Sequence, residues 1–144
     1  MSGISKTKVP RKRQSNEESK RQQAFIRWFD HQYPKLSILL FASANGRHGG
    51  GKTIKYKGKD IPLSAIKSKK EGQRKGVADL YLSVPKVTYN EETTKHGLYI
   101  ETKTDVGKQS EAQKEFQKAI EGQGYQYTIC RSVEEFIKTI NDYL

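Results

Sequence analysis

Apolar residues recur along this chain at two spacings, and the spacings predict where helices and strands lie. From Ser15 to Tyr33 they repeat every three or four residues, as on one face of a helix, and Pro34 ends the pattern. The residues on this face are Phe25, Ile26, Phe29 and Tyr33. The run 37–42 (SILLFA) is short, apolar and bounded, which is typical of a buried strand. The first part of the chain therefore predicts a helix followed by a strand.

The second half of the chain alternates between strand and helix patterns. The predicted strands are 77–84, 96–103 and 125–130, and the predicted helices are 111–121 and 132–144. The polar residues 86–95 are expected to connect the first two of these strands. The strand 125–130 follows a crossover helix, so we expect it to lie parallel to 96–103 with a right-handed connection. This order predicts an α/β sandwich with a mixed sheet covered on both faces.

The middle of the chain is rich in glycine, lysine and arginine and has the weakest pattern. Residues 53–57 and 59–63 could form a small hairpin about Gly58, and 61–69 a short helix.

Length and charge limit the possible functions. The chain has 144 residues and a formal net charge of +11, with 27 Lys and Arg against 16 Asp and Glu. We expect a disordered basic arm at 1–14 and one domain at 15–144. Such an excess favours a polyanionic partner, either nucleic acid or an anionic membrane surface. No apolar run is long enough to span a bilayer, and the single Cys130 fits a reducing compartment, so a cytoplasmic protein without a membrane partner is expected.

Two of the predicted strands each carry an acid that could serve in catalysis. Asp79 lies near the start of 77–84, and Glu101 lies near the end of 96–103, two residues before Lys103. Residues two apart on a strand point to the same face, so Glu101 and Lys103 should project together, and strand pairing could bring Asp79 beside them. Carboxylates and the backbone carbonyl of Thr102 would suit Mg²⁺ or Mn²⁺, and the Lys could stabilise a phosphoryl group. The set predicts phosphodiester hydrolysis.

The same spacing also occurs on solvated strand faces, because 30% of the residues are charged. Glu101, however, follows the apolar residues Leu98, Tyr99 and Ile100, so it lies at the end of a core strand.

Several short motifs, in this order, resemble the VRR-NUC branch of the PD-(D/E)xK nucleases. They are residues 18–22 (ESKRQ), 45–46 (NG), 69–72 (KKEG), 76–80 (GVADL), 97–103 (GLYIETK), 110–113 (SEAQ), 124–125 (GY) and 142–144 (DYL). The resemblance covers nearly everything after the basic arm. It implies a restriction-endonuclease-like fold in which a mixed central sheet is flanked by helices. The family usually has Pro before the Asp, where this chain has Ala78. We expect Ala to be tolerated there, since Pro mainly fixes backbone geometry.

The resemblance also implies roles for individual residues. It assigns metal binding to Asp79 and Glu101, catalysis to Lys103, and supporting roles to Glu18 and Gln113. Glu18 and Gln113 have a second interpretation as capping-box residues, because each lies three positions after a serine. If the helix register shifts by one residue, Glu17 replaces Glu18.

A second motif, 46–53 (GRHGGGKT), matches the P-loop pattern but lacks its expected setting. A P-loop needs a helix directly after Lys-Thr, and residues 54–61 have no helical pattern. We expect no nucleotide cofactor. A basic loop along DNA explains this segment better, and the predicted DNA contacts are Arg47, His48, Lys52, Lys55, Lys57, Lys69, Lys70, Arg74 and Lys75.

The sequence thus predicts a metal-dependent DNA endonuclease. By analogy with single-domain relatives, we expect a homodimer that cuts branched DNA such as Holliday junctions, in a bacterial or phage-infected cell. Two alternatives stay open: a non-catalytic nucleic-acid-binding module of the same fold, and a P-loop nucleotide-binding protein.

Overall fold

The fold places four helices around a small mixed sheet. The computed structural model describes residues 11–43 and 51–144, without the side chains of 11–14. The helices are α1 (Arg11–Gln32), α2 (Leu63–Lys70), α3 (Glu111–Gly122) and α4 (Val133–Tyr143), with a 3-10 turn η1 (Ser37–Leu39). The strands are β1 (Leu40–Ala42), β2 (Thr53–Tyr56), β3 (Lys59–Pro62), β4 (Leu80–Leu82), β5 (Lys86–Val87), β6 (Thr93–Lys95), β7 (Leu98–Thr102) and β8 (Gln126–Cys130).

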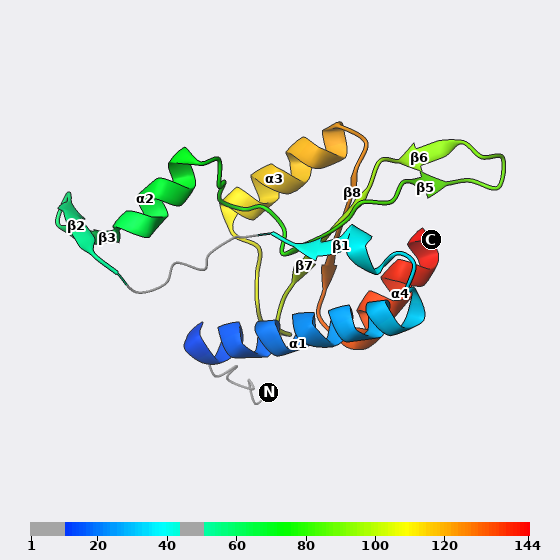
Figure 1. Ribbon diagram of the computed structural model, residues 1–144, viewed down its shortest axis with the longest axis horizontal. Coiled ribbons are helices and arrows are strands. Elements are labelled where there is room, and N and C mark those ends of the chain that lie inside the picture. Colours follow the sequence, from blue (N-terminus) through cyan, green and yellow to red (C-terminus); the bar gives the residue numbers. More distant parts are fainter. Residues whose placement is uncertain (1–10, 44–50) are drawn as a thin grey trace, which may run out of the picture.

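The central sheet has the order β1-β4-β7-β8. Strands β1, β4 and β7 pair antiparallel, and β8 pairs parallel with β7, with Ile100 opposite Thr128. The parallel pairing confirms the prediction from the crossover helix, and the mixed α/β architecture confirms the predicted fold class. Helices α1 and α4 lie on one side of the sheet and α3 lies on the other (Figure 1).

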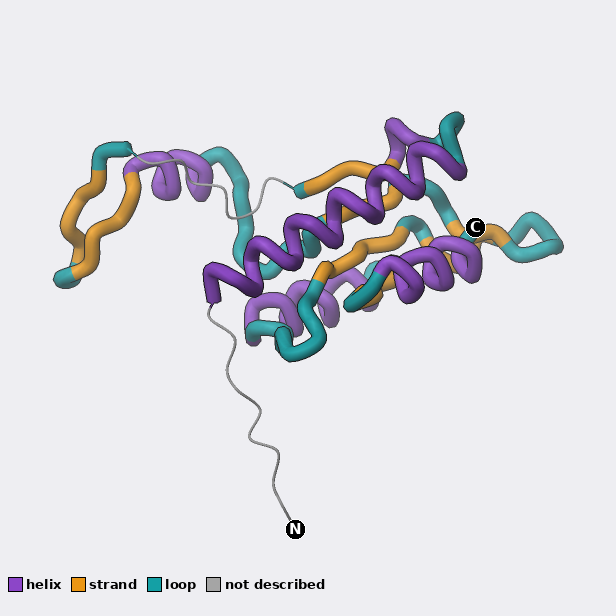
Figure 2. Tube along the Cα trace, turned by 90° about the horizontal axis from the view of Figure 1, so that it is seen from below, coloured by secondary structure: helices purple, strands orange, loops and turns teal. Residues whose placement is uncertain are grey.

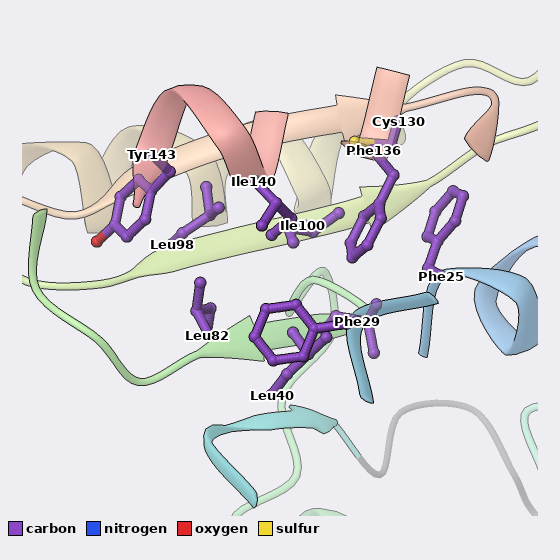
Figure 3. Close-up of a cluster of buried hydrophobic side chains, with 11 residues drawn as sticks. Phe25, Phe29, Leu40, Leu82, Leu98, Ile100, Cys130, Phe136, Ile140 and Tyr143 are labelled. Atoms are coloured by element: carbon purple, nitrogen blue, oxygen red, sulfur yellow. The ribbon is translucent and has the colours of Figure 1, made fainter. Parts of the chain in front are cut away.

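The main core lies between the sheet and the pair α1 and α4. The strands contribute leucine and isoleucine side chains, and the helices contribute aromatic rings (Figure 3). Phe25 of α1 stacks on Phe136 of α4, with ring centroids 4.4 Å apart and ring planes 4° apart. Both rings are fully buried. This contact packs the first helix against the last one on the same side of the sheet.

Several elements begin or end elsewhere than the sequence predicts. Helix α1 begins at Arg11, so residues 11–14 of the predicted basic arm form its first turn. Arg, Lys and Gln are good helix formers. Residues 1–10 lie outside the described part of the chain. The predicted strand 37–42 begins with η1, and only Leu40–Ala42 pairs with β4. Ile38, outside the sheet, is 86% exposed.

Strand β4 is shorter than the predicted 77–84, and Asp79 precedes it. The predicted polar connector 86–95 instead forms a second hairpin, β5 and β6, whose strands pair with a register shift.

Two small hairpins extend from opposite ends of the molecule (Figures 1 and 2). One consists of β5 and β6. The other consists of β2 and β3, followed by α2, and confirms the hairpin expected about Gly58. Lys57 and Gly58 form its turn with φ angles of 49° and 74°, as a two-residue hairpin turn of type I′ requires. The helix α2 is the short helix predicted at 61–69, shifted towards the C-terminus.

Candidate active site

The carboxyl end of β7 holds the two residues predicted to act together. Glu101 and Lys103 project to the α3 side of the sheet, whereas Thr102 between them is buried toward α1. The Lys103 Nζ lies 3.1 Å from Glu101 Oε1. The side chains of Lys103 and Glu101 are 12% and 3% exposed, so this ion pair is largely removed from water.

Asp79 lies next to this pair because β4 and β7 are neighbours in the sheet. Its Oδ2 accepts a hydrogen bond from the Thr102 backbone N–H at 2.9 Å. In an extended strand the N–H and C=O of one residue point to the same side, so the Thr102 carbonyl faces the Asp79 side as well. The structure therefore brings together the two predicted carboxylates and the predicted backbone carbonyl.

Gln113 is a helix cap, as one of its two interpretations predicts, and it also contacts Glu101. Its backbone N–H donates to Ser110 Oγ at 3.2 Å, and its Oε1 accepts from the Ser110 N–H at 2.9 Å, which completes a capping box at the start of α3. Its Nε2 also donates to Glu101 Oε1 at 2.5 Å. The cap fixes the side chain of Gln113, and the amide in turn fixes the carboxylate of Glu101.

Glu18 reaches the same region from α1, but it is not a helix cap. The capping-box interpretation with Ser15 is wrong, because α1 begins at Arg11 and both residues lie inside it. Burial raises the pKa of Glu18, while Lys103 and a hydrogen bond with the Thr104 backbone lower it. These influences place Glu18 beside the end of β7. Since Glu18 itself reaches this region, the shifted register that would replace it with Glu17 is not needed.

Burial dominates the electrostatics of the site. Desolvation, followed by the negative charge of Asp79, raises the pKa of Glu101 from 4.5 to about 7, although Lys103 opposes this. Desolvation also raises the pKa of Asp79, against the Thr102 N–H and Lys103. Three carboxyl groups with raised pKa values thus surround a single ammonium group. Such crowding of acids is common at catalytic or metal-binding sites.

The donor set suits a hard divalent cation. Glu101 Oε2 is buried and has no hydrogen-bond partner among the described residues. An orphaned carboxylate oxygen beside a second acid is the kind of ligand that Mg²⁺ or Mn²⁺ takes. No group of three or more His, Cys, Asp or Glu side chains within residues 11–43 and 51–144 could hold a metal by itself. The candidate ligands are therefore Asp79, Glu101 and the Thr102 carbonyl, a small set that suits Mg²⁺ because this ion keeps several waters.

Two arginines support the segment after Lys103, and the sequence analysis did not identify either. Arg21 of α1 donates to the backbone carbonyls of Lys103, at 2.9 Å, and of Arg131, and lies 3.2 Å from Asp105. Arg131 donates to the carbonyls of Thr104 and Gly107 at 2.5 and 2.7 Å. A weak signal for Arg21 existed, since it lies three residues after Glu18 on the same helical face.

Seven of the predicted DNA contacts lie between β2 and Asp79 or directly before β2. Lys52, Lys55 and Lys57 belong to the β2–β3 hairpin or precede it, and Lys69 and Lys70 end α2. Arg74 and Lys75 lie in the segment that leads to Asp79. All seven side chains are exposed. Arg47 and His48 lie outside the described residues.

Among the described residues, no helix lies directly after Lys52 and Thr53, where a P-loop requires one. The residues from Thr53 form β2, a strand paired with β3. Residues 46–50 of the motif are outside the described part of the chain.

Comparisons with known proteins agree on one family. A family model described as "VRR-NUC domain" matches residues 16–134. A solved structure described as "VRR_NUC domain protein" is similar with a TM-score of 0.67 and 22% sequence identity, over 89% of this chain and 88% of that one. At that identity the likeness concerns the fold alone. A comparison with curated proteins gives no match. Within the described residues, no helix has the length and apolar character that a membrane span requires.

Proposed function

The chain belongs to the VRR-NUC domain family of the PD-(D/E)xK nucleases, and we propose that it is a Mg²⁺- or Mn²⁺-dependent DNA endonuclease with its site at Asp79, Glu101 and Lys103. One observation carries the proposal: two neighbouring strands bring two carboxylates and an ammonium group to one sheet edge, and a buried Glu101 oxygen there has no hydrogen-bond partner in the part of the chain that the structure describes. A module that only bound DNA would gain nothing from these acids, because they repel phosphate.

Asp79, Glu101 and the Thr102 carbonyl would hold the metal. A divalent ion, when bound, neutralises charge on the phosphate and lowers the pKa of a coordinated water. The protein contributes rigidity to this set. Asp79 is fixed by the Thr102 N–H, and Glu101 is fixed by Gln113. Each acid is therefore held before substrate arrives, which reduces the reorganisation that the reaction requires.

Lys103 supplies the positive charge of the site. Its ammonium group is held 3.1 Å from Glu101 and largely shielded from water. From this position it would orient the attacking water or stabilise the negative charge that builds up on the phosphoryl group. Glu18 of α1 would add a third carboxylate to the site. We assign Gln113 a positioning role, since it contacts Glu101 and no reacting group.

The exposed lysines and arginines of the β2–β3 hairpin, α2 and the segment before Asp79 would bind the DNA backbone. This segment connects directly to a candidate metal ligand, so DNA held by α2 would be led toward the site. We further propose a homodimer acting on branched DNA, because a single domain with one site needs a second copy to make two symmetric cuts.

The test combines cleavage and binding in the full-length protein. A labelled four-way junction, a linear duplex and a single strand are incubated with Mg²⁺, Mn²⁺ or EDTA, and binding is followed in Ca²⁺. Lys103→Ala should bind DNA but lose cleavage by at least about 100-fold. Lys118→Ala, an exposed lysine on α3, should cut like the wild type. Sedimentation at several protein concentrations tests the homodimer.

Each result has a clear meaning. Metal-dependent cleavage that is lost only in Lys103→Ala supports the nuclease and the site. Binding without cleavage by the wild type refutes the nuclease for these substrates and favours the binding-module alternative. Equal cleavage of junction and linear duplex refutes selectivity for branched DNA while leaving the nuclease intact.

A further inference from the structure

The face of the sheet that carries Glu101 also carries a row of aromatic rings. Strand pairing places Phe41 of β1 opposite Tyr81 of β4, and Tyr81 opposite Tyr99 of β7. Tyr125, just before β8, lies against Tyr99 with ring centroids 5.6 Å apart. We call these four residues the aromatic strip. It crosses β1, β4 and β7 and ends directly before β8.

The rings of the aromatic strip contact one another in sequence. Phe41 packs edge-on against Tyr81, with centroids 5.5 Å apart, and Tyr81 lies 4.4 Å from Tyr99. The ring of Tyr81 lies close to the backbone of Gly97, where an added Cβ would be 2.5 Å from its hydroxyl oxygen. Gly97 therefore allows this ring to lie across the neighbouring strand.

The helix α3 covers only one end of the aromatic strip. Phe116 of α3 contacts Tyr99 with centroids 5.2 Å apart, and it also contacts Tyr127 of β8. At the other end Phe41 is 48% exposed, and Tyr81 is partly exposed. Large apolar rings that remain in contact with water next to a functional site are typical of binding surfaces.

The aromatic strip begins beside the candidate active site. Tyr81 follows Asp79 by two residues, and Tyr99 precedes Glu101 by two, so each pair shares one face. Two residues along a strand span about 7 Å. That distance is comparable with the step from one nucleotide to the next in an extended strand. A phosphate at the carboxylates would therefore leave an adjacent base within reach of the rings.

We propose that the aromatic strip is a stacking site for unpaired bases of DNA next to the phosphate that is cut. Aromatic rings stack on any base, whereas paired bases are closed to them. The chain as a whole is strongly cationic, so it attracts the phosphate backbone of a DNA strand. None of the four residues of the aromatic strip carries a charge, so bases that reach the strip contact uncharged rings. The inference rests on the proposed function, and it specifies the substrate as DNA with an unpaired region beside the scissile phosphate.

The experiment measures binding in EDTA, so that it does not depend on cleavage. Two duplexes of the same sequence are compared, one fully paired and one with a short unpaired gap that contains a fluorescent adenine analogue quenched by stacking. The variants are Phe41→Leu and Tyr81→Leu. The control is Tyr89→Leu, which removes a 97% exposed ring beyond β5, away from the sheet. Thermal unfolding verifies that each variant folds, and Phe41→Leu changes only an exposed position.

We expect each strip variant to bind the gapped duplex about tenfold more weakly and to lose the quenching, with the paired duplex changed by less than about twofold. Tyr89→Leu should resemble the wild type. Equal weakening for both duplexes, or none for either, overturns the stacking site, even if the wild type cleaves DNA and the proposed function stands. If Phe41→Leu instead abolishes self-association, the aromatic strip is an interface between copies and the inference is wrong. Selective binding by a wild type that never cleaves would keep the stacking site and refute the nuclease.

Discussion

Replacing Glu101 with Gln should stabilise the metal-free protein at neutral pH while removing a candidate metal ligand. The Glu101 side chain is 3% exposed, beside Asp79, and its pKa rises from 4.5 to about 7. The folded protein therefore holds this proton more tightly than the unfolded chain. Gln resembles the neutral acid, and its carbonyl oxygen can still accept from Gln113.

The size of the effect follows from the pKa values. Below pH 4.5 Glu101 is protonated in both states and its burial as an ion costs nothing. Between pH 4.5 and 7 the unfolded chain releases the proton and the folded chain keeps it, so the free energy of unfolding falls as the pH rises. Above pH 7 this decrease in the free energy of unfolding is complete, and it amounts to about 3 kcal/mol. Glu101→Gln does not suffer this loss, so its advantage should grow from near zero in acid to about 3 kcal/mol at alkaline pH.

Urea unfolding in EDTA at several pH values measures this difference. At this chain length the advantage corresponds to roughly 10 °C in Tm. Glu115→Gln on the exposed surface of α3 is the matched control and should show no pH-dependent advantage. Added Mg²⁺ should raise the Tm of the wild type and leave that of Glu101→Gln nearly unchanged. A difference between Glu101→Gln and the wild type that stays the same from pH 5 to pH 8 would refute the reasoning.

Three further substitutions test the surroundings of the site. Gly76→Ala should lower the free energy of unfolding in urea by more than about 2 kcal/mol, because φ is 82° and a Cβ would lie 2.2 Å from the Ala112 carbonyl oxygen. Gly122→Ala, with open space around the added Cβ, should be neutral or stabilising. Similar free energies for the two variants would contradict this prediction. Arg21→Met should lower kcat about 10- to 100-fold and leave DNA binding in Ca²⁺ unchanged, because the substitution removes the hydrogen bond that holds the backbone carbonyl of Lys103 after β7. An unchanged kcat would show that Arg21 does not position the site. Phe136→Ala should lower the free energy of unfolding by about 3–5 kcal/mol, and a loss below about 1 kcal/mol in the same assay would contradict the packing described here.

Local features of the sequence were sufficient to predict most of the elements. Successive side chains of a strand point to opposite faces of the sheet, so the shared face of Glu101 and Lys103 followed from the period of a strand. The parallel partner strand followed from the helix that crosses between them. Boundaries were less accurate where an element depends on distant partners. The run 37–42 looked uniformly apolar, yet only its last residues meet β4.

The candidate site shows the same division. Sequence motifs were sufficient to select Asp79, Glu101 and Lys103 as a group, and the capping box at Ser110 and Gln113 is local enough to be recognised by spacing. No spacing could indicate that the amide of Gln113 also reaches Glu101, because that contact depends on how α3 packs over the sheet.

The sequence by itself determined the order of the four helices and of the four strands of the central sheet, the face on which each acid lies and the charge that favours DNA. These properties depend on residues close together in the chain, where helix and strand periods act. Only the tertiary structure decided how deeply Glu101 is buried, that Arg21 supports the end of β7, and that rings from separate strands form one strip. Those properties depend on groups far apart in sequence, and the free energy that fixes them comes from excluding water between packed elements.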